Sequence, residues 1–141
     1  MGLIRLGNKP PLIVAPQASV VDAARAMTER QVGAATVVEG GAVLGVVTER
    51  DMMKKVLATQ RDAASTTVRD IMTSPVISVD LKTTVAEAAA LMRRHHIRHL
   101  VVLDRRQGNA LVGMLALRYL LYDLMDDMQR NVGHDVADQV A

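Results

Sequence analysis

The order of apolar and polar residues predicts a strand, a helix, a hairpin of two strands and a second helix, and this order occurs twice. In the first copy, prolines on both sides of the first apolar run favour a strand, because a helix interior does not accept proline. Ser19 can cap the helix that follows, and we expect Gly33 to end it. Gly40 and Gly41 suit the turn of a hairpin. The predicted elements are residues 12–14, 20–31, 35–38, 43–47 and 49–58.

The second copy follows the first at a nearly constant spacing. A shift of 65 residues carries Met27 onto Met92, and after the hairpin turn a shift of 68 carries Gly45 onto Gly113. A surface loop lengthened by three residues explains the change. Two copies of this length indicate a paired module and not an open array of repeats. The predicted elements of the second copy are residues 76–79, 85–92, 100–103, 111–115 and 117–130.

The two copies define the predicted domain organisation. We assign residues 1–67, which end in a small polar linker at 62–67, to the first repeat and residues 68–141 to the second. Each half has about 70 residues, a length at which a separate core is only marginally stable, so we expect one compact module. Residues 135–141 have weak periodicity, and we expect them to fray. The predicted fold class is α/β (α+β), with tandem β-α-β-β-α repeats.

Composition narrows the classes of function. The chain of 141 residues is half apolar, yet it has no Phe, Trp or Cys. Without cysteine there are no disulfides and no thiol catalysis, which agrees with a reducing compartment. No segment approaches the apolar run of about 18 residues that a membrane helix needs. The net charge is +2, with both signs interleaved. We therefore expect a cytoplasmic protein that has neither a membrane nor a nucleic acid as a partner.

Two motifs carry a family resemblance. The third strand of the first copy ends in Gly45-Val46-Val47-Thr48, and Asp51 follows three residues later. The segment that opens the second copy reads Asp70-Ile71-Met72-Thr73. Together with the repeat, these motifs resemble a stand-alone CBS domain pair, also called a Bateman module, over nearly the whole chain. The resemblance implies that the repeats pack about a pseudo-twofold axis and hold adenosine-containing ligands in the clefts between them.

The resemblance places the ligand site at Thr48 and Asp51. It implies that Asp51 accepts hydrogen bonds from the ribose hydroxyls, while the Thr48 hydroxyl and the amides at the helix start suit a phosphate. Arg50 would add a charge-assisted contact to that phosphate. A purely structural alternative exists, because Thr48-x-x-Asp51 is also a capping-box pattern. Both arrangements can occur in one protein, one with the ligand and one without it.

The resemblance also implies a pocket for the base. Its walls would be backbone and small side chains of the first two strands of the first copy. The alternative is that these small residues only allow the strands to pack closely. The candidate residues are Leu12, Ile13, Gly33, Ala34 and Ala35.

The second copy departs from the family pattern. Ala116 and Tyr119 stand at the positions of the hydroxyl and the carboxylate of the first site, so both groups are missing. We expect this second site to bind a nucleotide weakly or not at all. Thr73 is retained before the second copy, whereas the matching position before the first copy is Asn8.

A dense basic cluster follows the second copy's first helix. The resemblance implies that two of its members, Arg98 and His99, contact a phosphate held at Thr48 and Asp51. A solvated helix end is the alternative, since basic residues are favoured at helix C-termini. Metal binding by His95 and His99 is disfavoured, because the helix should end between them. The cluster comprises Arg93, Arg94, His95, His96, Arg98 and His99.

The leading hypothesis is a non-catalytic regulatory module that binds an adenosine nucleotide of the AMP, ADP or ATP class, with no other cofactor and no metal. The sequence has no recognisable catalytic triad, Walker-type loop or paired carboxylates at a cleft. The alternative is a dimerisation scaffold whose ligand site has decayed. An apolar helical surface favours a homodimer, and the downstream protein partner is unidentified. That surface comprises Leu117, Leu120, Leu121, Leu124, Met125 and Met128, with Met52, Met53 and Val56.

Overall fold

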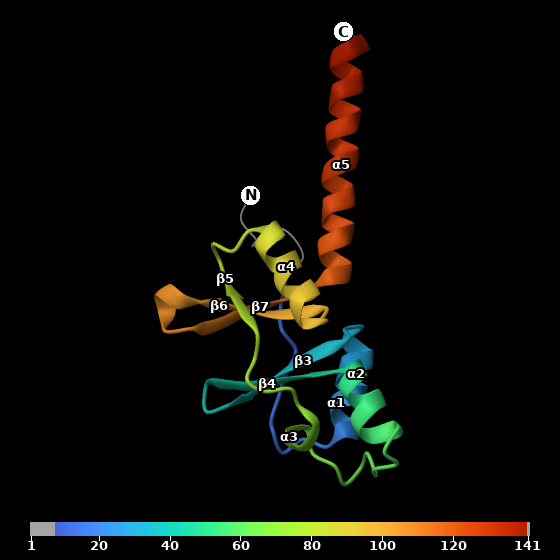
Figure 1. Cartoon of the computed structure of the whole chain (residues 1–141), viewed down its shortest axis with the longest axis vertical. Coiled ribbons are helices and arrows are strands. Elements are labelled where there is room, and N and C mark those ends of the chain that lie inside the picture. The colour runs from blue at the N-terminus through green and yellow to red at the C-terminus, as the bar shows by residue number, and fades with distance from the viewer. Residues whose placement is uncertain (1–7, 141) are drawn as a thin grey trace. The chain divides into compact units, whose positions relative to one another are not determined.

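The computed structural model describes residues 8–140 and, within them, the side chains of residues 9–131. The chain forms two compact units, one being Pro11–Ile77 and the other Ser78–Ala141 together with Met1–Pro10. Each unit combines a small β-sheet with helices (Figure 1). The predicted fold class, mixed α and β in two tandem copies, is confirmed.

The unit Pro11–Ile77 is built on a three-stranded sheet. The strand order is β2-β3-β4, with β2 parallel to β3 and β3 antiparallel to β4. A turn of π-helix, η2, continues α2 without a break, and this helical segment lies beside α1 (Figure 1). The elements are β2 (Ile13–Val14), α1 (Val20–Arg30), β3 (Ala34–Glu39), β4 (Ala42–Thr48), α2 (Glu49–Met52), η2 (Met53–Leu57) and α3 (Val68–Ile71).

Helix α1 begins as the sequence predicts and ends earlier. The Ser19 hydroxyl accepts a hydrogen bond from the Asp22 amide at 3.0 Å, which confirms the expected cap. The prediction that Gly33 ends the helix is wrong. Gln31 adopts the left-handed conformation with a φ of 55°, and its amide donates to carbonyls of the last turn. A residue other than glycine therefore forms the C-cap.

The predicted hairpin between β3 and β4 is confirmed. Gly40 and Gly41 have φ angles of 57° and 79°, in a region that glycine enters without steric cost. The corresponding turn of the other unit contains a 3-10 helix, and Gly108 and Asn109 after it also have positive φ. The insertion that changes the repeat spacing lies in this longer turn.

One face of the β2-β3-β4 sheet packs against α1, η2 and α3. Because side chains alternate along a strand, Val14, Val37 and Val47 share this face. The core of this unit consists of aliphatic side chains and one methionine, which explains why it needs no aromatic residue. Its members are Val14, Val20, Ala23, Met27, Ala35, Val37, Val47, Val56, Val68 and Ile71.

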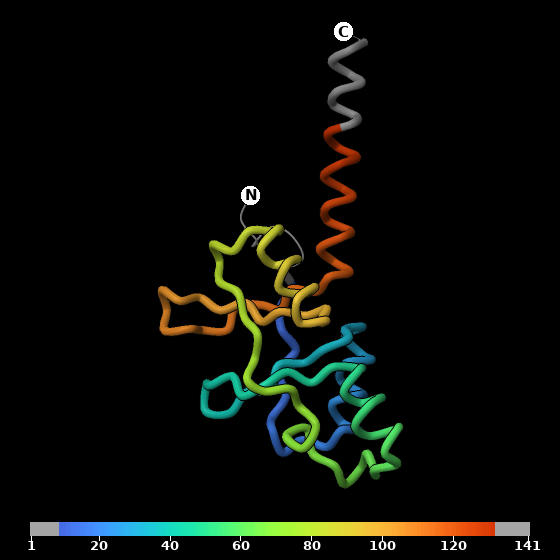
Figure 2. The backbone as a smooth tube through the Cα atoms, viewed as in Figure 1, coloured from blue at the N-terminus to red at the C-terminus, as the bar shows by residue number. Residues whose placement is uncertain are grey.

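The predicted linker is an integral part of this unit. The Val20 amide donates to the Thr66 carbonyl at 2.9 Å, so the linker is bonded to the start of α1. Helix α3 follows, and the sequence analysis does not predict it. A capping box of Thr67 and Asp70 begins α3, and Ile71 is fully buried. Figure 2 shows the backbone running from η2 through this segment and back toward β4.

The residues after α3 extend the sheet at its β4 edge. Val46 and Thr73 exchange two backbone hydrogen bonds, of 3.1 and 2.8 Å. Gly45 permits this approach, because a Cβ at that position would stand 2.8 Å from the Met72 sulfur and 2.8 Å from the Thr73 carbonyl oxygen. The glycine therefore determines how closely the segment can lie against β4.

The other unit has a four-stranded sheet of order β1-β7-β6-β5. Strand β5 is parallel to β6, and the other two pairs are antiparallel. Thr84 and Glu87 form a capping box that begins α4. The elements are β1 (Asn8–Lys9), β5 (Ser78–Asp80), α4 (Val85–His95), β6 (His99–Asp104), η3 (Arg105–Gln107), β7 (Ala110–Ala116) and α5 (Leu117–Val140).

Helix α5 extends from Leu117 to Val140, whereas the sequence predicts a helix over 117–130. Residues 135–140, which we expect to fray, belong to this helix, and Ala141 lies outside the described residues. Within the described residues, no helix has both the length and the apolar composition that a membrane crossing requires.

Each sheet pairs with a segment from the other sequence copy. Thr73, at the start of the second copy, pairs with β4, and β1, at the start of the first copy, pairs with β7. The compact units accordingly divide after Ile77, whereas the sequence repeats divide after Thr67. Each repeat, as the sequence divides the chain, therefore contributes a short segment that pairs with a strand of the other repeat.

Candidate functional site

The predicted pair Thr48 and Asp51 lies where β4 passes into α2. Thr48 has extended dihedral angles and is the N-cap, so its carbonyl begins the helix while its side chain stays outside it. The Asp51 amide donates to the Thr48 hydroxyl oxygen at 3.1 Å. In return, Asp51 Oδ2 accepts from the Thr48 amide at 2.9 Å and from the Thr48 hydroxyl at 3.1 Å. The capping-box interpretation of this motif is therefore confirmed.

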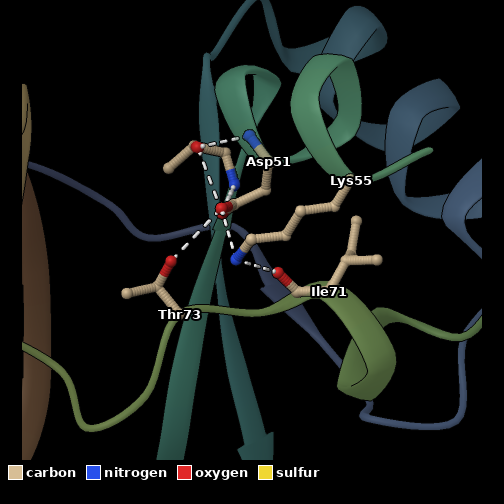
Figure 3. Close-up of polar contacts among 5 residues, drawn as sticks. Asp51, Lys55, Ile71 and Thr73 are labelled. Atoms are coloured by element: carbon tan, nitrogen blue, oxygen red, sulfur yellow. Dashed lines mark hydrogen bonds and ion pairs between the residues drawn. The ribbon is translucent and has the colours of Figure 1, made fainter. Parts of the chain in front are cut away.

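The second oxygen of Asp51 joins this cap to two other parts of the unit (Figure 3). Asp51 Oδ1 accepts from the Thr73 hydroxyl at 3.2 Å and lies 3.0 Å from Lys55 Nζ. Lys55 also donates to the carbonyl oxygen of Ile71 at 2.9 Å. Thr73 reaches the carboxylate because its backbone is paired with β4. Lys55 reaches it because residues four apart lie on the same side of a helix.

Asp51 is a buried acid, only 6% exposed. Burying a carboxylate without hydrogen-bond or ion-pair partners would lower the free energy of unfolding. Four donors satisfy Asp51, one of them the Lys55 ammonium, whose side chain remains 44% exposed. Such a carboxylate has acceptor oxygens only, so it suits a ligand that presents hydroxyl or amine donors. The group therefore has the chemistry required to bind a sugar diol.

The register of the sheet decides which pocket candidates lie near Thr48. Ala34 pairs with Thr48, and Ile13 pairs with Thr36, so these residues share the sheet face opposite the helices. Ile13 is 54% exposed there. Ala35 points to the other face, where it belongs to the buried core. A ligand beside Thr48 could therefore contact the Ala34 side chain but only the backbone of Ala35.

The remaining candidates of this unit have different surroundings. Leu12 packs against the core, and its carbonyl accepts from the Thr36 amide at 2.8 Å. The Gly33 carbonyl accepts from the Glu49 amide at 3.0 Å, which fixes the start of α2. Arg50 is exposed on α2. Backbone contacts therefore hold the Leu12 and Gly33 segments against the sheet and the helix start.

Arg98 and His99 belong to the other compact unit. His99 opens β6 and pairs with Ala116, while the Arg98 carbonyl accepts from the Leu117 amide at 2.9 Å. Helix α4 ends at His95, as the sequence predicts, before this pair begins. Among the described residues, no group of three or more histidines and acids is placed to hold a metal ion.

Tyr119 confirms that the two copies differ in chemistry. The Lys9 ammonium and the Arg118 guanidinium each lie 5.1 Å from the centre of its ring. Tyr122 packs edge-on against the same ring, with the centroids 6.2 Å apart. Ala116, the counterpart of Thr48, has no hydroxyl. This position presents an aromatic ring with two cations near it where the first copy presents a buried carboxylate.

The sequence analysis misses two residues of the first unit. Lys55 follows Asp51 by four positions, a helical ion-pair spacing that could have identified it. Thr36 is fully buried. Among the residues that the structure describes, its hydroxyl is the buried side-chain polar group without a hydrogen-bond partner. Its counterpart in the second copy is Val101, and this contrast between the copies was the available signal.

Comparison with known proteins identifies the fold family. The family model of the CBS domain matches residues 5–58 and 68–126, which are the two sequence copies. Over 114 residues the chain is 34% identical to the CBS domain-containing protein YhcV of Bacillus subtilis, covering 81% of this chain and 79% of YhcV. It is 35% identical over 121 residues to the mitochondrial protein CBSX3 of Arabidopsis thaliana. The match spans 79% of this chain but only 57% of that longer relative.

Solved structures agree with this assignment. A CBS-domain protein from Burkholderia ambifaria has a TM-score of 0.78 and 36% identity, with 86% of each chain covered. The CBS domain protein PAE2072 of Pyrobaculum aerophilum, solved in complex with AMP, has a TM-score of 0.71 and 30% identity, covering 84% of this chain and 93% of its own. A hexameric CBS-CP12 protein from cyanobacteria has a TM-score of 0.77 and 26% identity, covering 86% and 70%.

Proposed function

Because the chain belongs to the CBS domain family, we propose that it is a non-catalytic regulatory module that binds an adenosine nucleotide of the AMP, ADP or ATP class. The ribose hydroxyls would donate to Asp51 at the start of α2. The observation that carries this proposal is a buried carboxylate beside an extended strand edge, in a family where PAE2072 is solved with AMP. A carboxylate that only closed a helix cap would not need to be buried.

The proposal assigns the other parts of the nucleotide to the predicted residues. The base would lie against Ile13 and Ala34 on the sheet face that also carries Thr48. Arg50 would contact the phosphate, because guanidinium groups form strong charge-assisted hydrogen bonds with phosphate oxygens. Arg98 and His99 are the further candidates for phosphate contact. Since Tyr119 replaces the acid in the second copy, we propose one nucleotide for each chain.

Calorimetric titration of AMP, ADP, ATP, NAD, S-adenosylmethionine and GTP, with Asp51→Asn as the test variant, addresses this proposal. Asp70→Asn is a matched control, because Asp70 has the same position in the capping box of α3 but is exposed. Loss of hydrogen bonds to a charged group should weaken binding about 10- to 100-fold in Asp51→Asn. Asp70→Asn should bind as the wild type does. If no adenosine nucleotide binds, or if Asp51→Asn binds normally, the site is wrong.

A second candidate function is assembly through an exposed apolar face of α5. Leu121, Met125 and Met128 follow each other at helical spacing and are 50%, 57% and 66% exposed. Leu120 and Val56, which the sequence analysis places on the docking surface, are instead buried at 2% and 3% and belong to the interior. The hexameric cyanobacterial relative shows that members of this family assemble.

We propose that this α5 face forms a homodimer, in which a nucleotide would alter the contacts offered to a downstream protein. Light scattering should give the mass of a dimer at micromolar concentration, and Met125→Glu should give a monomer, because it places a charge in the apolar face. A dimeric Met125→Glu protein would contradict this interface. A dimer that binds no nucleotide would favour a scaffold over a sensor.

A further inference from the structure

The Asp51 carboxylate has no acceptor position left for a ligand. A carboxylate offers about four acceptor positions, two on each oxygen. Oδ2 accepts from the Thr48 amide and hydroxyl at 2.9 and 3.1 Å. Oδ1 accepts from the Thr73 hydroxyl at 3.2 Å and pairs with the Lys55 ammonium at 3.0 Å. A ribose hydroxyl can therefore bind Asp51 only if one of these donors leaves.

The donors on Oδ2 are fixed by the fold. The Thr48 amide belongs to the backbone at the helix start, and the Thr48 hydroxyl also accepts from the Asp51 amide. On Oδ1, the backbone of Thr73 is fixed by two hydrogen bonds to Val46, which keep its short side chain beside Asp51. Displacing the Thr48 side chain would break the cap, and the Thr73 side chain could rotate away only by giving up its hydrogen bond to Asp51, so exchange of either threonine has a cost.

Lys55 differs from the threonines in each of these respects. Its side chain is 44% exposed and long, so water can solvate its ammonium group when it leaves Asp51. It also has a second acceptor, the Ile71 carbonyl at 2.9 Å, which it can keep when it leaves Asp51. Figure 3 shows the ammonium between these two oxygens, beside Thr73. Lys55 is therefore the donor that a ligand can replace.

We propose that Lys55 competes with the vicinal hydroxyls of the ligand for the Asp51 carboxylate. In the free protein its ammonium holds the fourth acceptor position of Asp51, and a ligand with vicinal hydroxyls binds by taking over that position on Oδ1. The proton count does not change, because one donor replaces another on the same carboxylate. This inference rests on the proposed nucleotide site, and it specifies the part of the nucleotide that makes the exchange. A nucleotide without the ribose hydroxyls has nothing with which to replace Lys55.

The test compares Lys55→Met with Lys54→Met in calorimetric titrations of AMP and 2′,3′-dideoxy-AMP. Both variants lose one positive charge at adjacent positions, but Lys54 is exposed, and the ion pair with Asp51 is made by Lys55. Removal of a partly exposed ion pair should raise the AMP affinity of Lys55→Met about two- to fivefold above that of Lys54→Met. The affinity for 2′,3′-dideoxy-AMP should be equal in the two variants. Lys55→Gln replaces Lys55→Met if the latter does not fold.

Three results would overturn the exchange. An AMP affinity of Lys55→Met equal to that of Lys54→Met would show that Lys55 does not compete. A lower affinity would show that Lys55 is itself a ligand contact. An equal gain for both nucleotides would show that the ribose hydroxyls are not involved. Each of these results leaves the nucleotide site standing, whereas a wild type that binds no adenosine nucleotide refutes the site together with the exchange.

Discussion

Alanine at Gly45 should destabilise the unit Pro11–Ile77 by forcing the Thr73 segment away from β4. The new Cβ would stand 2.8 Å from the Thr73 carbonyl oxygen and 2.8 Å from the Met72 sulfur. Methionine can change its rotamer, but the carbonyl belongs to a backbone held by two hydrogen bonds to Val46. The strain must therefore fall on those hydrogen bonds.

The expected size follows from two opposing terms. Overpacking of a close contact costs about 1–3 kcal/mol. Replacing glycine by alanine recovers about 0.4–1 kcal/mol, because the unfolded chain becomes less flexible. Gly45→Ala should thus lower the free energy of unfolding by about 1–2 kcal/mol. The same shift would move the Thr73 hydroxyl away from Asp51 Oδ1, to which it donates at 3.2 Å.

Gly33→Ala is the matched control for this experiment. Its Cβ would meet the Glu49 carboxylate at 3.0 Å, which is the end of a flexible side chain that can move aside. We expect this variant to be as stable as the wild type or slightly more stable. Urea denaturation followed by circular dichroism, at one protein concentration for all variants, measures the difference. Equal unfolding free energies for Gly45→Ala and Gly33→Ala would refute the close approach of Thr73 to β4.

Two further substitutions test other features of this unit. Thr36→Val should raise the melting temperature, because it removes a buried hydroxyl without a partner, a defect that costs about 1–3 kcal/mol; an unchanged or lower melting temperature would mean that the hydroxyl is paired. Asp70 tests the cap of α3, because the Thr67 amide hydrogen bond lowers the pKa of Asp70 below its ordinary value of 3.8. A lowered pKa stabilises the fold above the unfolded value, and this stability is lost as the pH falls through the native value. Asp70→Asn should therefore be less stable than the wild type at neutral pH but not in acid, and a pH-independent difference would contradict this.

Local signals in the sequence were sufficient for most of the fold. The Ser19 cap, the Gly40-Gly41 turn and the helix after Thr48 depend on interactions within a few residues, and the structure confirms them. Features that depend on distant contacts were missed. Helix α3 is too short for periodicity to reveal it, and its stability comes from the burial of Val68 and Ile71.

In the candidate site, too, the sequence predicts the residues of a local motif and misses those that depend on distant contacts. Asp51 was identified because its motif is continuous in sequence. The role of Thr73 was not identified, because Thr73 reaches Asp51 only through a pairing with β4 that no local pattern encodes. Lys55 lies at a spacing that predicts its bond to Asp51, but its second bond, to Ile71, joins residues 16 apart. Local motifs in the sequence therefore identify Asp51, the hydrogen-bond acceptor of the site, but not Thr73 and Lys55, the donors that occupy its Oδ1 atom.

The number of AMP molecules bound to each chain tests the central claim most directly. Equilibrium dialysis with labelled AMP at saturating concentration measures this number for the wild type and for Asp51→Asn. Since Asp51 is buried in one copy and Tyr119 replaces it in the other, we predict one AMP for each wild-type chain. At the lowest AMP concentration that saturates the wild type, Asp51→Asn should bind well below one AMP, because its affinity is lower. Two AMP molecules for each chain, or an Asp51→Asn protein that binds as much AMP as the wild type at that same concentration, would contradict a single site built on Asp51.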